Sequence, residues 1–242
     1  MSKRAIILNS VIFLLVSNFY LRAQNRPDMQ KLTPKRFVDK VEILIGPNLI
    51  IPNADSWTTF YNNSSPGSTY KIQQKIGLSA GVGLIHSIGG RFEIQGRFLW
   101  ERKGYFDRYV TKGDSGKVYQ SDNNFKNDYV TISLVPIYFL GARRKVHVFS
   151  GINYSLLTKS RDLAEQYVNG QLMSKGIIII DNTAPYDINV LVGLGYFYSL
   201  GKKTGINFRI QGNMGLTDSV NANKYIVRSN SIILFAGLRL VR

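Results

Sequence analysis

The sequence predicts an all-β fold, an eight-stranded antiparallel up-and-down β-barrel. Two observations predict it: eight segments alternate apolar and polar residues with period two, and the connections between them are alternately long and short. Period two gives strands with two different faces. One end with short turns and one with long loops is typical of a membrane barrel. The expected strands are Val41–Ile51, Ile76–Ser87, Phe92–Glu101, Tyr129–Leu140, Val146–Leu157, Tyr186–Leu200, Ile206–Leu216 and Ser231–Val241.

The expected strand Phe92–Glu101 separates its two faces most clearly. Its apolar face includes Phe98 and Trp100, whereas Arg97 and Glu101 lie on the other face. A soluble, lipocalin-like barrel would turn the apolar face inward around a ligand. A transmembrane barrel turns it outward to lipid and fills its narrow lumen with polar side chains.

Three features favour the transmembrane barrel. The polar face is rich in Gly, Ser and Asn, which suits a crowded lumen; its charges can neutralise one another there; and the short turns all fall at one end. Unpaired buried charges are costly, so we expect an ion-pair network that plugs the lumen. The predicted luminal network consists of Glu42, Arg91, Glu93, Arg97, Glu101, Arg209 and Arg239.

The connection lengths fix the orientation of this barrel. With both chain ends in the periplasm, connections one, three, five and seven lie outside, and these are the long ones: Pro52–Gln74, Gly104–Lys126, Thr158–Pro185 and Thr217–Arg228. Trp100 and Tyr154 then approach the outer membrane interface, and Tyr138, Tyr196 and Tyr198 the inner one, as in aromatic girdles. Within the third long connection we expect a helical turn near Asp162–Tyr167 and a β-prone segment at Gly176–Ile180.

The first 23 residues read as a secretory signal peptide. A basic start at Lys3 and Arg4 precedes a short apolar stretch, and Ala23 offers a cleavage site, which predicts export to the outer membrane of a Gram-negative bacterium. Residues 24–38 are expected to be a flexible periplasmic leader and 39–242 the barrel. Cleavage lowers the formal charge from +16 to +13. The chain has no Cys, which excludes disulfides and thiolate chemistry.

Several short motifs carry a resemblance to a known family. Ile45-Gly46-Pro47-Asn48, the stretch from Phe98 to Gly104 and Leu134-Val135-Pro136-Ile137-Tyr138 occur in an order that resembles the PorT-like outer-membrane β-barrel domain of Bacteroidota, a porin-family group. The resemblance covers about residues 40–242. It implies a cell-envelope protein, from a family that includes a component associated with type IX protein secretion. The end Leu240-Val241-Arg242 departs from the aromatic terminus that the barrel-assembly machinery usually reads.

Catalytic signatures are weak. Glu93 and Glu101 are candidates for an acid and a base, but ion pairing is the simpler role for luminal carboxylates. His86 and His147 are the only histidines; they have no third ligand at metal spacing and are expected at the membrane interface. No Gly-x-Ser-x-Gly motif occurs. We therefore expect no enzyme, no metal and no cofactor.

The positive charge favours lipid rather than nucleic acid, which an exported barrel would rarely meet. Cations in the short turns are expected to contact lipid headgroups: Arg143, Arg144, Lys145, Lys202 and Lys203. Others at or beyond the outer rim are expected to meet lipopolysaccharide phosphates: Arg102, Lys103, Arg108, Lys112 and Lys117.

Three functions follow from these patterns. The first is a non-enzymatic barrel that binds an envelope or secretion protein, with Trp57, Phe60 and Tyr61 of the first long loop as expected contacts. The second is a small passive channel, although eight-stranded lumens are normally filled by side chains. The third is a hydrolase borne on the barrel.

Overall fold

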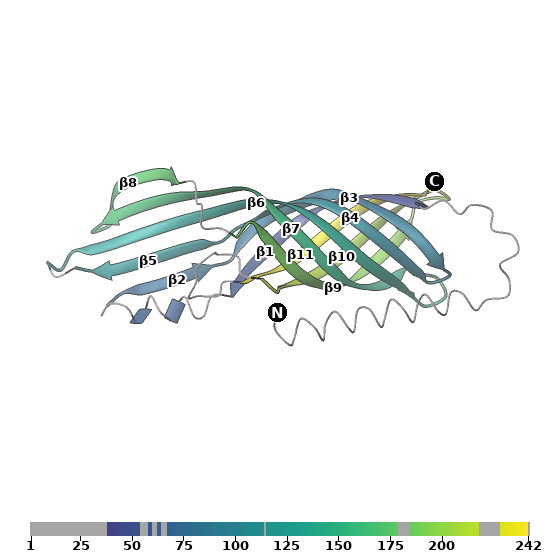
Figure 1. The fold of residues 1–242 in the computed structure, drawn as a ribbon, viewed down its shortest axis with the longest axis horizontal. Coiled ribbons are helices and arrows are strands. Elements are labelled where there is room, and N and C mark those ends of the chain that lie inside the picture. Colours follow the sequence, from purple (N-terminus) through teal and green to yellow (C-terminus); the bar gives the residue numbers. More distant parts are fainter. Residues whose placement is uncertain are drawn as a thin grey trace, which may run out of the picture. The chain divides into compact units, whose positions relative to one another are not determined.

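The computed structural model describes residues 38–53, 58–59, 62–63, 67–113, 115–178, 184–217 and 228–241. The predicted signal peptide and its cleavage site, nearly all of the predicted leader, and Trp57, Phe60 and Tyr61 lie outside the described residues. The described part forms one antiparallel sheet of eleven strands (Figure 1). These are β1 (Lys40–Asn53), β2 (Thr69–Gln73), β3 (Lys75–Gly89), β4 (Phe92–Lys103), β5 (Phe106–Lys112), β6 (Val118–Leu140), β7 (Val146–Val168), β8 (Gln171–Ile178), β9 (Tyr186–Ser199), β10 (Thr204–Gly215) and β11 (Arg228–Val241).

Eight of these strands pair in a ring, in the order β1, β3, β4, β6, β7, β9, β10 and β11. The ring is completed by β1 and β11, which pair from Lys40 opposite Val241 to Asn53 opposite Arg228. Each ring strand matches one of the eight segments expected from the alternation. The prediction of an all-β, antiparallel, up-and-down barrel-like sheet is confirmed.

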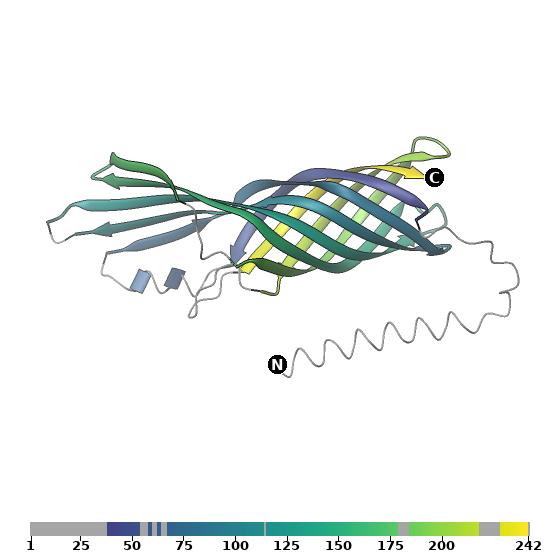
Figure 2. The ribbon, with the colours of Figure 1, turned by 45° about the horizontal axis from the view of Figure 1, so that its top comes forward.

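The two ends of the ring differ as the loop lengths predict. Short turns join β3 to β4, β6 to β7 and β9 to β10 at one end, where β1 begins and β11 finishes (Figures 1 and 2). Gly141 and Arg144 take positive φ angles of 67° and 49° in the β6–β7 turn. At the other end β2, β5 and β8 lie beside the long strands. In the described part of the chain, no helix is long and apolar enough to cross a membrane.

Beyond the ring, β6 and β7 continue as a flat extension. Both strands have 23 residues and pair along nearly their whole length. Their outer halves carry β5 and β2 on one side and β8 on the other, so the order is β2-β5-β6-β7-β8. We call these five outer segments the projecting sheet; Figure 2 shows it leaving the ring at one end.

The projecting sheet corrects two expectations and confirms the described part of a third. The helical turn predicted at Asp162–Tyr167 is wrong, because these residues belong to β7. The predicted loop Gly104–Lys126 contains β5 and the first part of β6. The β-prone Gly176–Ile180 is confirmed only through Ile178, as the end of β8. Polar and charged side chains lie on both faces of this sheet, among them Asp107, Asp122 and Asp162, so its strands lack the apolar alternation that identifies a half-buried strand.

A β-bulge separates the two parts of β7. Asp128 of β6 pairs with Lys159, whereas Tyr129 pairs with Leu157, which leaves Thr158 as an extra residue. The Thr158 hydroxyl donates to the Asp128 carbonyl at 2.9 Å. Because side chains alternate along a strand, one extra residue exchanges the two faces. Odd-numbered residues of β7 such as Asn153 face the interior before the bulge, whereas even-numbered ones share that face after it.

Apolar side chains lie on the outside of the ring. Phe98, Leu134 and Val192 are 56%, 61% and 59% exposed, while the inward-facing Gln95 and Arg97 on β4 are buried. Exposed tyrosines occur near both ends of this apolar belt: Tyr154 and Tyr186 toward the projecting sheet, and Tyr138, Tyr196 and Tyr198 toward the short turns. Tyr154 and Tyr186 stack at a centroid distance of 6.3 Å. Apolar side chains outside and polar side chains inside are the inverse of the distribution found in soluble proteins.

The interior is more apolar than the sequence suggests. Two buried clusters lie among the polar groups: one of Val135, Ile137, Phe139, Phe149 and Leu191, and one of Leu44, Leu99, Ile233 and Phe235. Glycines provide room for large inward side chains on neighbouring strands. A Cβ at Gly83 would lie 2.1 Å from the Gln95 Nε2, and one at Gly195 would lie 2.2 Å from the His147 Nε2. The glycine-rich face therefore serves close packing.

Candidate functional site

The centre of the interior is the Glu42 carboxylate on β1. Its Oε2 accepts hydrogen bonds from the Arg209 Nη2 and the Gln95 Nε2, both at 2.6 Å, and its Oε1 accepts one from the Asn207 Nδ2 at 2.7 Å. The Arg239 Nε lies 3.6 Å from the Oε1. Glu42 is completely buried. Four neighbours from β4, β10 and β11 thus satisfy one carboxylate, as a buried charge requires.

Gln95 connects Glu42 to the buried arginines. Its Oε1 accepts hydrogen bonds from the Arg209 Nη1 at 2.6 Å and the Arg97 Nε at 2.9 Å. Arg97 also donates through its Nη1 to the Gln211 Oε1 at 2.6 Å. Its guanidinium lies 5.3 Å from the Phe149 ring centroid. Amide acceptors and an aromatic ring therefore hold the Arg97 charge.

The network reaches the end with the short turns through Glu93. Its carboxylate accepts a hydrogen bond from the Arg239 Nη1 at 3.1 Å and another from the Lys40 Nζ. The Arg239 guanidinium lies 5.0 Å from the Phe197 ring centroid. Arg91 is not part of this buried group: it is exposed in the β3–β4 turn and lines an opening of about 200 Å³ beside Glu93.

A second buried network lies nearer the projecting sheet. The Glu101 Oε2 accepts a hydrogen bond from the Thr131 hydroxyl at 2.6 Å and lies 3.5 Å from the Lys103 Nζ. Lys103 also reaches Asp187 at 3.3 Å and is 5% exposed. Sequence reasoning placed Lys103 at the outer rim and did not single out Asp187. The alternation could have found both, since Lys103 shares a face with Glu101, and Asp187 with Asn189.

The interior carboxylates Glu93 and Glu101 are both engaged in ion pairs. Glu93 and Glu101 lie on one strand, eight residues and roughly 26 Å apart, and each is held by a cation.

His147 is fully buried beside Phe139, at a ring centroid distance of 5.2 Å, so its expected place at the membrane interface is wrong. His86 lies 3.5 Å from Asp39. Among the described residues, no three His, Asp or Glu side chains gather as a metal site would require.

Large side chains, including several from the first network, fill the interior of the ring. Residues less than 2% exposed come from around the ring; the largest are Arg97, Arg239, Leu44, Ile50, Ile85, Leu99, Ile137, Leu191, Ile233, His147, Gln95 and Gln211. The arrangement fits a packed core rather than an open passage.

The basic turns lie at the opposite end from the projecting sheet. Five cations are exposed there, in the β6–β7 and β9–β10 turns and close in sequence to the exposed Tyr138 and Tyr198: Arg143, Arg144, Lys145, Lys202 and Lys203.

Solved outer-membrane proteins are similar to this chain in structure. Ail, the attachment invasion locus protein of Yersinia pestis, is 13% identical, with 84% of this chain and 99% of Ail covered and a TM-score of 0.41. Neisserial surface protein A is 15% identical, with 84% and 97% covered and a TM-score of 0.40. The outer membrane protease OmpT from Escherichia coli is 9% identical, with 88% and 99% covered and a TM-score of 0.41.

These TM-scores lie below 0.5, so our description of the fold rests on the strand pairings of this chain. No protein-family model matches the sequence. No curated protein matches it either. Membership of the PorT-like family therefore stays a prediction.

Proposed function

We propose that this chain is an integral outer-membrane β-barrel of the PorT-like kind, an eight-stranded transmembrane barrel processed after Ala23. The observation that carries this proposal is the inverted distribution of side chains. A belt of exposed apolar residues surrounds the ring, while the carboxylates of Glu42, Glu93 and Glu101 inside it are buried and paired with cations. In water such a belt would aggregate, whereas in a bilayer it is the surface that lipid requires. The barrel-assembly machinery is the partner that insertion would need.

The barrel's role is non-enzymatic, and its projecting sheet binds an envelope or secretion protein. The interior network supports this role, because its carboxylates are held by cations and its side chains are closely packed. The projecting sheet ends in the short strands β2 and β8, whose outer edges have no partner among the described strands. An exposed edge presents backbone donors and acceptors to an extended segment of another protein. The predicted contacts Trp57, Phe60 and Tyr61 belong to the connection that leads into β2.

The register of the strands allows a clean test. Lys103 and Asn127 are opposite each other, as are Leu156 and Tyr186. Two Asn-Gly turns joining these pairs would remove most of the projecting sheet and keep the barrel. Wild type captured from native outer membranes is expected to bring down a protein that the trimmed variant does not. Equal capture by a trimmed variant that still folds would contradict the role of the sheet.

The two alternative functions have separate readouts. A packed lumen predicts no stable conductance in planar bilayers, and a large steady conductance would favour the passive channel. A barrel-borne hydrolase would lose activity in Glu93→Gln, so any hydrolysis abolished by that change would favour an enzyme.

A further inference from the structure

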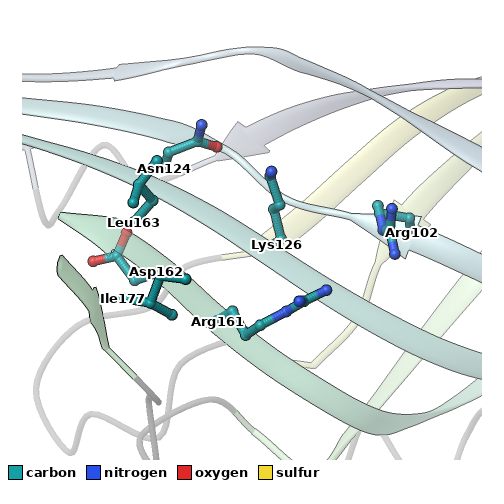
Figure 3. Close-up of a pocket in the computed structure, with 7 residues that line it drawn as sticks. All are labelled: Arg102, Asn124, Lys126, Arg161, Asp162, Leu163 and Ile177. Atoms are coloured by element: carbon teal, nitrogen blue, oxygen red, sulfur yellow. The ribbon is translucent and has the colours of Figure 1, made fainter.

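A basic pocket opens where the barrel passes into the projecting sheet. It has a volume of about 150 Å³ and is bounded by β4, β6, β7 and β8. Figure 3 shows its lining residues, Arg102, Asn124, Lys126, Arg161, Asp162, Leu163 and Ile177. Most of these side chains share the sheet face that continues the outside of the barrel, because Lys126 is opposite Arg161, and Asn124 is opposite Leu163.

The pocket lies immediately beyond the apolar belt. Arg102 follows Trp100 on the same face of β4, roughly 7 Å farther along the strand, and its guanidinium lies 5.1 Å from the Trp100 ring centroid. If the belt faces lipid, as the proposed function requires, Trp100 marks the outer interface and the pocket is at the depth of the lipid headgroups. The inference below rests on that placement.

Positive charge at this pocket exceeds its neutralisation. Arg102, Lys126, Lys159 and Arg161 share the outer face around one carboxylate, that of Asp128. Asp128 accepts hydrogen bonds from the Arg102 Nε at 2.7 Å and Nη2 at 3.2 Å, and lies 3.9 Å from the Arg161 Nη2. Four cations around one anion leave an excess of three positive charges.

Asp128 is not among the lining residues; the one carboxylate that is, Asp162, does not remove this excess. Arg161 and Asp162 are neighbours on β7, so their side chains take opposite faces, and in Figure 3 they point in opposite directions. A further cation lies behind the pocket: the Lys75 Nζ donates to the Phe125 carbonyl at 2.8 Å and to the Asn124 Oδ1. A ligand that completes the pocket is therefore an anion.

The surroundings define what kind of anion fits. Arginine offers a planar set of N–H donors and lysine a compact charge, a combination suited to phosphate oxygens. Leu163 and the 69% exposed Ile177 add apolar walls that a free inorganic ion would not use. We infer that the pocket formed by Arg102, Lys126 and Arg161 binds the phosphate group of a phosphorylated glycolipid in the outer leaflet.

The test uses the full processed chain, folded in neutral detergent and titrated with bisphosphorylated lipid A or with the same glycolipid after dephosphorylation. Native mass spectrometry counts the bound lipid. Wild type is expected to bind the phosphorylated form at least tenfold more tightly. The double change Lys126→Gln and Arg161→Gln is expected to abolish that preference. Arg102 is left intact because it holds Asp128.

Two further variants make the result specific. Lys112→Gln with Lys117→Gln removes the same charge from exposed positions at the far tip of the projecting sheet and should keep the preference. The exchange of Lys126→Arg with Arg161→Lys keeps the charge and should retain most of it. Heat-modifiable migration in gels confirms that each variant is folded.

Three outcomes would overturn the inference: equal binding of both glycolipids by wild type, equal loss in the tip control, or complete displacement of the lipid by millimolar inorganic phosphate. The last would assign the pocket to free phosphate. Failure of the chain to enter bilayers at all would instead contradict the proposed function.

Discussion

The barrel interior and the projecting sheet both contain close ion pairs between a glutamate and a cation, but the first pair is buried and the second is exposed to solvent. Inside the ring, Arg209 and Glu42 lie 2.6 Å apart with no exposure of either side chain. In the projecting sheet, Lys175 and Glu165 lie 2.7 Å apart, but the Lys175 side chain is 55% exposed. At nearly equal distances, we therefore expect the two pairs to contribute very differently to the free energy of unfolding. Water replaces a lost partner on the sheet, whereas a lost partner in the interior leaves a bare charge.

The largest effect that this comparison predicts is at Glu42. Glu42→Gln keeps the shape but leaves Arg209 and Arg239 without their shared carboxylate. Breaking a buried pair from one side costs about 3–5 kcal/mol of unfolding free energy. Urea unfolding of the protein in lipid vesicles, followed by gel migration, measures it.

Glu165→Gln on the projecting sheet is the matched control and should leave the unfolding curve unchanged, because water solvates Lys175. If the two variants unfolded at the same urea concentration, the buried pair would contribute no more to stability than the exposed one, contrary to our expectation.

The second prediction concerns the two exposed apolar surfaces. Leu134 on the ring is 61% exposed and Met173 on β8 is 66% exposed. If lipid covers only the first, Leu134→Arg destabilises by about 2–4 kcal/mol near the middle of the belt. Met173→Arg, in water, should change the stability by about 0.5 kcal/mol or less. The same vesicle unfolding assay compares the two variants. A similar loss of unfolding free energy in both would contradict the expectation that lipid covers only the ring.

The smallest effect is a pH dependence confined to the projecting sheet. Burial raises the pKa of Asp162 from its ordinary 3.8 to about 6, and the nearby Asp107 adds to the rise. Because the folded sheet holds a proton that the unfolded chain has released, its stability falls as the pH rises from about 4 to 6. Amide hydrogen exchange in β7 and β8, corrected for intrinsic rates, should be several-fold faster at pH 7 than at pH 4.5. Asp162→Asn should remove the difference; a variant with the same dependence would exclude Asp162 as its source.

The ring was predictable from the sequence because exposed apolar positions and buried positions alternate along its strands. Phe98 and Arg97 show the rule: neighbours in sequence take opposite faces, one exposed and one buried. Of the seven residues expected inside, six are buried, whereas Arg91, in the β3–β4 turn, is exposed. The partners within the network were beyond reach, since Arg209 and Glu42 are 167 residues apart.

The projecting sheet was less predictable because its stabilising contacts are polar. In β5, Asp107 accepts a hydrogen bond from the Tyr70 hydroxyl at 2.7 Å, and Arg108 pairs with Asp122 at 2.8 Å. Such residues are typical of loops as well as of solvated strands. The apolar interior cluster around Phe149 was missed for a related reason: its members are spread over β6, β7 and β9, and no single strand reveals them.

The extra residue Thr158 has an electrostatic consequence. Because it bulges out of the pairing, Lys159 and Arg161 lie on the outer face of the sheet, opposite Asp128 and Lys126, and Asp162 lies on the other face. If Thr158 instead paired regularly with Asp128, without a bulge, Lys159 and Arg161 would face inward and the acidic Asp162 would face outward. The sign of the charge on this face thus depends on how the backbone accommodates one residue, and not only on which residues the strand contains.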